Sequence, residues 1–144
     1  MAYHMKEISK GKLGEFSKIE EELLEFEDAM NQSCILMAIL ELSDLLGAIE
    51  AYFLKENKES LFKTILKNTN SSKSQEGDVE LLKNAFYITK ESFEKKLLHH
   101  FSDFSTLLEE IENFVDDYNF TLNDLMIMKD ITKRAFLSGK RNAG

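Results

Sequence analysis

CILMAILELSDLLGAIEAYF, residues 34–53, lies within the longest apolar stretch of the chain. Its aliphatic residues recur at intervals of three and four rather than two, which predicts a helix over about residues 32–56. Because this helix is apolar nearly all round, we expect it to lie in the middle of a bundle or an oligomer. Glu41, Asp44 and Glu50 interrupt the stretch, and such charges disfavour a membrane-spanning helix.

The same periodicity extends over much of the chain. The sequence has no proline and only six glycines, so we predict an all-α protein, with four long helices as the economical count. The small, polar segment KNTNSSKSQEGD, residues 67–78, indicates a loop. The other three helices are predicted at about 12–30, at about 79–117 with a possible break near 99–105, and at about 121–138.

Length and composition indicate a soluble globular protein. The chain has 144 residues, of which 43% are hydrophobic and 31% charged. We interpret MAYHM, residues 1–5, as a leader derived from a cloning vector, and residues 6–144 as a single helical domain. A net charge of -8 disfavours a nucleic-acid polymer as partner. With no secretory or membrane-spanning segment and one cysteine, Cys34, we expect a cytoplasmic protein that does not bind membranes.

Glu41 and Asp44 are the informative residues of the apolar stretch, because their neighbours are isoleucine and leucine. A helix turns by about 100° per residue, so both carboxylates share a face with small side chains that leave room for a ligand. These small residues are Cys34, Ala38, Ala48 and Ala51. An ionised carboxylate in apolar surroundings is costly unless it is paired or bound to metal. The alternative is a buried salt bridge to a lysine on another helix.

A second acidic cluster lies in IEEELLEFEDA, residues 19–29, where Glu22 and Glu25 share one face of the first predicted helix. An ordinary solvated helix face is the alternative for such a charge run. We assign the remaining acidic residues to solvent or to local pairing: Glu20, Glu27 and Asp28. Two antiparallel helices that each offer carboxylates at i and i+3 make an oxygen-rich pocket. Oxygen ligands without histidine or thiolate favour Mg²⁺ or Mn²⁺.

The histidines do not add to this pocket. His99 and His100 are adjacent in sequence, so they diverge on a helix and make a poor chelating pair. We expect both on the surface.

Three segments together carry a family resemblance: KIEEELLEFEDA (18–29), LELSDLLGAI (40–49) and NDLMIMKDITKRAFLSGKR (123–141). They resemble the MazG-like, all-α nucleoside triphosphate pyrophosphatases, with two glutamate-containing i, i+3 pairs and a basic last helix. The resemblance implies antiparallel helices that form a homodimer or homotetramer. It also implies Mg²⁺-dependent hydrolysis of a nucleoside triphosphate, with Mn²⁺ as a substitute, to the monophosphate and pyrophosphate.

Carried over by position, the resemblance assigns roles to individual residues. The metal ligands would be Glu22, Glu25, Glu41 and Asp44. The cations that contact the phosphates would be Lys18, Lys129, Lys133 and Arg134. Basic residues near a helix C-terminus also suit the helix dipole, which is the alternative for the last three. Water activated by metal would attack the α-phosphorus, and Glu21 or Glu22 would take its second proton.

Two other functional classes compete with this enzyme. A non-catalytic helical protein-interaction module would equally use the apolar helix and the acidic surface. A metal-storage or oxygen-activating four-helix protein is disfavoured because the Glu-x-x-His pattern is missing. A glycine-rich GxxxxGK[ST] phosphate loop is also missing from the sequence, which disfavours a kinase or a motor NTPase.

Overall fold

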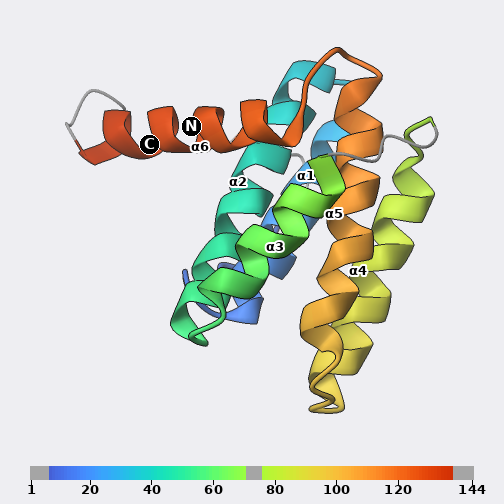
Figure 1. Cartoon of the computed structure of the whole chain (residues 1–144). Coiled ribbons are helices and arrows are strands. Elements are labelled where there is room, and N and C mark those ends of the chain that lie inside the picture. The colour runs from blue at the N-terminus through green and yellow to red at the C-terminus, as the bar shows by residue number, and fades with distance from the viewer. Residues whose placement is uncertain (1–6, 71–75, 138–144) are drawn as a thin grey trace. The chain divides into compact units, whose positions relative to one another are not determined.

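The computed structural model describes residues 7–70 and 76–137, apart from the side chains of residues 70 and 132–137. Every regular element in these ranges is a helix, which confirms the all-α prediction (Figure 1). The helices are α1 (Phe16–Asn31), α2 (Ile35–Lys55), α3 (Glu59–Asn70), α4 (Val79–Glu94), α5 (His100–Asp116) and α6 (Leu122–Leu137). Among them, none is long and apolar enough to cross a membrane. The proposed leader, residues 1–5, lies outside the described residues.

The helices divide between two compact units. The first unit runs up to Glu59 and resumes at Asn123, so it contains α1, α2 and nearly all of α6. The second unit is Ser60–Leu122, with nearly all of α3 and the whole of α4 and α5. Chain length alone does not reveal this division, because 144 residues are compatible with one compact domain.

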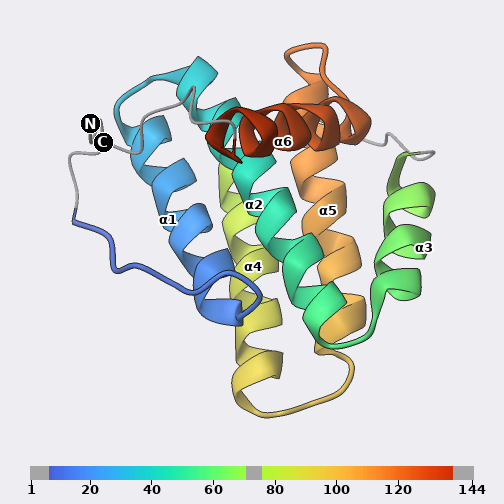
Figure 2. The same ribbon diagram turned by 90° about the vertical axis from the view of Figure 1, so that its left-hand side faces the viewer.

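In the first unit, α1 and α2 pack together as an antiparallel hairpin (Figure 2). Their apolar faces are buried, as periodicity predicted: Phe16, Ile19, Leu23 and Phe26 from α1, and Leu42, Leu45, Leu46, Ile49 and Phe53 from α2. The large apolar side chains that α2 leaves exposed are Leu36 and Leu54, near its two ends. Burial within one chain therefore accounts for most of the apolar character that led us to expect an oligomer.

In the second unit, α4 and α5 form another antiparallel hairpin (Figure 1). The start of α4 is fixed by Asp78, whose side chain accepts hydrogen bonds from the backbone N–H groups of Glu80 and Leu81. Gly77 lies so close to α5 that an added Cβ atom would be 2.4 Å from the Cα atom of Phe114. A glycine is therefore required where the chain enters α4.

Four helices end with the same turn, although none of the turns contains a glycine. A left-handed residue follows the last helical residue by two positions in α1, α2 and α4 and by three in α5, with φ of 57° at Ser33, 60° at Asn57, 58° at Lys96 and 67° at Asn119. In each case the next N–H group donates to a carbonyl five residues earlier, as Cys34 does to Ala29. This hydrogen-bond pattern is the Schellman motif, which satisfies the last carbonyl groups of a helix.

The predicted count of four helices was wrong, because the described residues contain six. Helix α3 was not predicted, and it extends to Asn70, into the segment 67–78 that was expected to be a loop. Phe62, Ile65 and Thr69 of α3 are buried at a spacing of three and four, a short pattern among many polar residues. The long helix predicted at 79–117 is divided between α4 and α5, and its break lies earlier than expected.

Candidate metal centre

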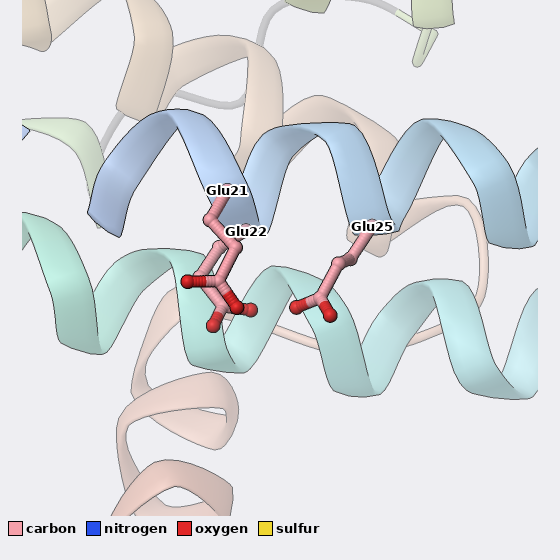
Figure 3. A group of neighbouring side chains, drawn as sticks. All are labelled: Glu21, Glu22 and Glu25. Carbon is pink, nitrogen blue, oxygen red and sulfur yellow. The ribbon is translucent and has the colours of Figure 1, made fainter. Parts of the chain in front are cut away.

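The α1–α2 hairpin brings together the carboxylates predicted to bind metal. Oxygen atoms of Glu22, Glu41 and Asp44 lie within 4.8 Å of one another, and so do oxygen atoms of Glu21, Glu22 and Glu25. Glu22 belongs to both groups and therefore lies at their centre. Figure 3 shows the three α1 carboxylates extending towards α2. We refer to Glu22, Glu25, Glu41 and Asp44 as the acidic site.

Burial makes this arrangement costly for the protein alone. Glu22 and Glu41 are each only 5% exposed, while Glu25 and Asp44 are half-buried. Within the described residues, Glu22 Oε2 is buried and has no hydrogen-bond partner. A buried carboxylate oxygen without a donor loses its hydration and gains nothing in return. The solvated-face alternative is therefore wrong for Glu22.

The electrostatics of Glu22 follow from this position. Burial raises the pKa of its carboxyl group to about 9, and the neighbouring carboxylates of Glu25 and Asp44 add to the effect. Lys18 acts in the opposite direction and does not outweigh them. In the absence of a metal ion, the site therefore retains a proton at neutral pH.

Lys18 lies beside the acidic site and contacts the carboxylates of Glu21 and Glu22. Its Nζ atom is 3.1 Å from Glu21 Oε1 and 3.2 Å from Glu22 Oε1. Burial alone would lower the pKa of Lys18, but the carboxylates of Glu22 and Glu21 outweigh it and hold the pKa above its usual value. Lys18 is therefore a permanent cation beside the carboxylates.

Glu21 differs from Glu22, although the two are adjacent and both buried. Glu21 Oε1 accepts a hydrogen bond from the backbone N–H of Gly11 at 2.8 Å and another from Lys18. Its Oε2 atom faces Lys10 Nζ at 3.7 Å. The contribution of Gly11 and Lys10 was not predicted, because residues 7–14 have no helical periodicity that would place them against α1.

Of the three α6 residues predicted to bind phosphate, the structure describes the side chain of Lys129. Lys129 forms ion pairs with Glu50 of α2 and with Asp130, and its stem packs beside Gly47. Burial lowers its pKa, but Glu50 and Asp130 together outweigh burial and raise it. The side chains of Lys133 and Arg134 lie outside the described residues.

Two further sequence predictions have mixed outcomes. Asp28 is locally paired, since it accepts a hydrogen bond from Gln32 Nε2 at 3.0 Å, but it is buried rather than solvated. His99 is exposed as expected. His100 is not: it is buried, and its ring lies against Phe101. His100 is buried because its ring packs against an aromatic side chain. Two adjacent histidines in a sequence do not indicate that one of them makes such a contact.

No protein-family model, curated protein or solved structure matches this chain. The functional inference therefore rests on the acidic site and on the residues that surround it.

Proposed function

We propose that this protein is a metal-dependent nucleoside triphosphate pyrophosphohydrolase, which cleaves a (d)NTP to the monophosphate and pyrophosphate. The observation that carries the proposal is the environment of Glu22. It is buried among other carboxylates, and no described residue hydrogen-bonds to its Oε2 atom. A cation beside Glu22 would offset this unfavourable burial, whereas a purely structural role would favour leucine at this position.

The donor set suits a hard divalent cation. The groups that converge around Glu22 consist of carboxylates, without histidine or cysteine. Such oxygen ligands favour Mg²⁺, and Mn²⁺ accepts the same ligands. Glu22, Glu25, Glu41 and Asp44 would hold the ion. Binding would displace the proton that Glu22 retains at neutral pH, so the affinity for metal should rise with pH.

The surrounding residues suit a phosphorylated substrate. When bound, the cation neutralises phosphate charge and activates water for attack at the α-phosphorus. Lys18 supplies a positive charge next to the carboxylates, in a chain whose net charge of -8 otherwise repels phosphate. Of the two residues predicted as bases, Glu21 is already engaged by Lys18 and Gly11. Glu22 is therefore the better candidate to accept the proton of the water.

The proposal includes an antiparallel bundle that assembles as a homodimer or homotetramer in the cytoplasm. Its rival is a non-catalytic interaction module made of helices. A module of that kind has no use for a buried carboxylate cluster, because replacing the acidic residues by apolar ones would make it more stable. The acidic site therefore favours the enzyme.

The test is Asp44→Asn, with Glu94→Gln as a control that removes one exposed carboxylate from α4. Hydrolysis of each common NTP and dNTP is measured with Mg²⁺, with Mn²⁺ and in EDTA. Thermal melts are recorded with and without Mg²⁺. Asp44→Asn should leave the metal-free protein as stable or more stable, because it relieves crowding of negative charge. It should also abolish the Mg²⁺-induced rise in Tm and reduce turnover by orders of magnitude.

The same measurements distinguish the structural alternative. If Asp44 were half of a buried salt bridge, Asp44→Asn would cost about 3–5 kcal/mol of stability and the Mg²⁺ shift would persist. That result, or full turnover of the wild-type protein in EDTA, would overturn the proposal.

A further inference from the structure

The segment Lys10–Lys12 is held firmly against the first turns of α1, although it belongs to no helix. The N–H of Gly11 donates to Glu21 Oε1 at 2.8 Å, and the N–H of Lys12 donates to Ser17 Oγ at 3.1 Å. An added Cβ atom on Gly11 would lie 2.3 Å from the carbonyl oxygen of Ser17. The segment can approach α1 this closely only because residue 11 is a glycine.

This anchoring brings Lys10 to the same carboxylate that Lys18 of α1 contacts. Lys18 Nζ contacts Glu21 Oε1 at 3.1 Å, and Lys10 Nζ lies 3.7 Å from Glu21 Oε2. An oxygen of Glu21 is in turn within 4.8 Å of oxygens of Glu22 and Glu25. The side chain of Lys10 is 84% exposed, so its ammonium group has hydrogens left to donate to a ligand.

We infer that Glu21 is a positioning residue, which holds Lys10 and Lys18 so that they bind the phosphates that leave as pyrophosphate. This inference rests on the proposed function. Each oxygen of Glu21 already faces a cation or an N–H group, which favours a positioning role over a role as metal ligand or as base.

The charge of the leaving group explains why the lysines bind it. Water adds to the α-phosphorus and loses a proton to Glu22. The bond from the α-phosphorus to its bridging oxygen breaks, and the electron pair stays on pyrophosphate. The β- and γ-phosphates are negatively charged both in the bound substrate and in free pyrophosphate, so fixed ammonium groups bind both, and loss of these groups raises KM and the inhibition constant of pyrophosphate. The nucleoside carries no such charge, so the paired lysines indicate that the β- and γ-phosphates lie towards the start of α1.

Three variants test the inference, and Lys12→Met is their control. Lys12 belongs to the same segment and carries the same charge, but its partner is Glu15, at 4.0 Å. Lys10→Met should raise KM and the inhibition constant of pyrophosphate by about tenfold, since one charge-assisted contact is lost. Gly11→Ala should do the same by displacing the segment without changing any charge. Lys12→Met should change either constant by less than about twofold.

Glu21→Gln separates positioning from the other roles of this residue. We expect a higher KM, kcat within about threefold of wild type, and unchanged Mg²⁺ affinity of the free protein measured by calorimetry. A large loss of kcat at constant KM, with loss of the acidic limb of the pH–rate profile, would identify Glu21 as the base. Weakened Mg²⁺ binding would identify it as a ligand. Either result overturns the inference.

The outcome for the wild-type protein keeps the two proposals distinct. If it hydrolyses no nucleoside triphosphate with Mg²⁺ or Mn²⁺, the proposed function fails and this inference fails with it. If it is active, but Lys10→Met behaves like Lys12→Met, the inference alone is overturned.

Discussion

Glu21 and Glu22 show how two identical, adjacent residues acquire different roles. Both are buried on α1. Glu21 contacts Gly11, Lys10 and Lys18, whereas in the described part of the chain Glu22 Oε2 lacks a donor. The sequence predicted that one of them bears on catalysis, but it did not show which. The distinction depends on Gly11, which is ten residues away and outside any helix.

We expect Glu22→Gln to stabilise the metal-free protein at alkaline pH. A carboxyl group with a pKa of about 9, raised from 4.5, binds its proton more tightly in the folded state than in the unfolded one. Its contribution to stability is therefore complete below about pH 4.5 and is lost as the pH rises towards about 9. In EDTA at pH 8, Glu22→Gln should be more stable than wild type by roughly 1–3 kcal/mol.

Urea unfolding of both proteins between pH 5 and pH 9 measures this difference. Addition of Mg²⁺ should reverse the order, because the ion stabilises only the protein that retains the carboxylate. Equal pH dependence of the two proteins in EDTA would show that Glu22 titrates normally.

Helix interiors were easier to predict than helix ends. The apolar spacing of three and four located α1, α2 and α6 to within a few residues. The end of α4 could not be located in the same way, because Lys96 adopts a left-handed backbone without the glycine that normally marks it. Lys96 looks like a helical residue in the sequence, so α4 and α5 were predicted as one interrupted helix.

Lys96→Gly should therefore increase stability. The left-handed conformation, with φ of 58°, costs a lysine on the order of 1 kcal/mol that glycine does not incur. We expect a gain of about 0.5–1 kcal/mol in the free energy of unfolding, measured with denaturant. Glu94→Gly, at the last residue of α4, is the control and should be destabilising. A loss of stability in Lys96→Gly would contradict the left-handed turn.

Lys129 tests whether α6 is held to α2 by an ion pair. Its side chain is 17% exposed and that of Glu50 is 29% exposed, so water screens their interaction only in part. Lys129→Met and Glu50→Gln should each destabilise the protein by about 1 kcal/mol, and the double variant by less than the sum. Additive effects in this double-mutant cycle would exclude a direct interaction. If Lys129 also contacts phosphate, Lys129→Met will raise KM and Glu50→Gln will not.

For the molecule as a whole, the site was more predictable than the packing around it. Two carboxylate pairs at i and i+3, on the facing sides of two helices that form a hairpin, lie close together as soon as the hairpin forms. Glu22, Glu41 and Asp44 do so. The division of the chain into two units depends on contacts between residues distant in sequence. A single sequence contains no direct record of such contacts.

The last prediction concerns assembly. Burial within one chain covers most of α2, but apolar side chains remain exposed elsewhere at helical spacing: Leu81 and Ile88 on α4, and Ile127 and Ile131 on α6. Neighbouring exposed residues of this kind favour contact with another surface. At micromolar concentration, light scattering should therefore give at least twice the 16.6 kDa of one chain.

Charged substitutions can identify the surface involved. If α4 forms the contact, Ile88→Lys should dissociate the assembly while Ile131→Lys does not, and the opposite result would assign the contact to α6. The side chain of Ile88 is 60% exposed and that of Ile131 is 58% exposed, so neither substitution should disturb the fold of the monomer. A mass of one chain for the wild-type protein would show that these residues are ordinary exposed side chains. The acidic site, which lies within one α1–α2 hairpin, would then have to act without a second subunit.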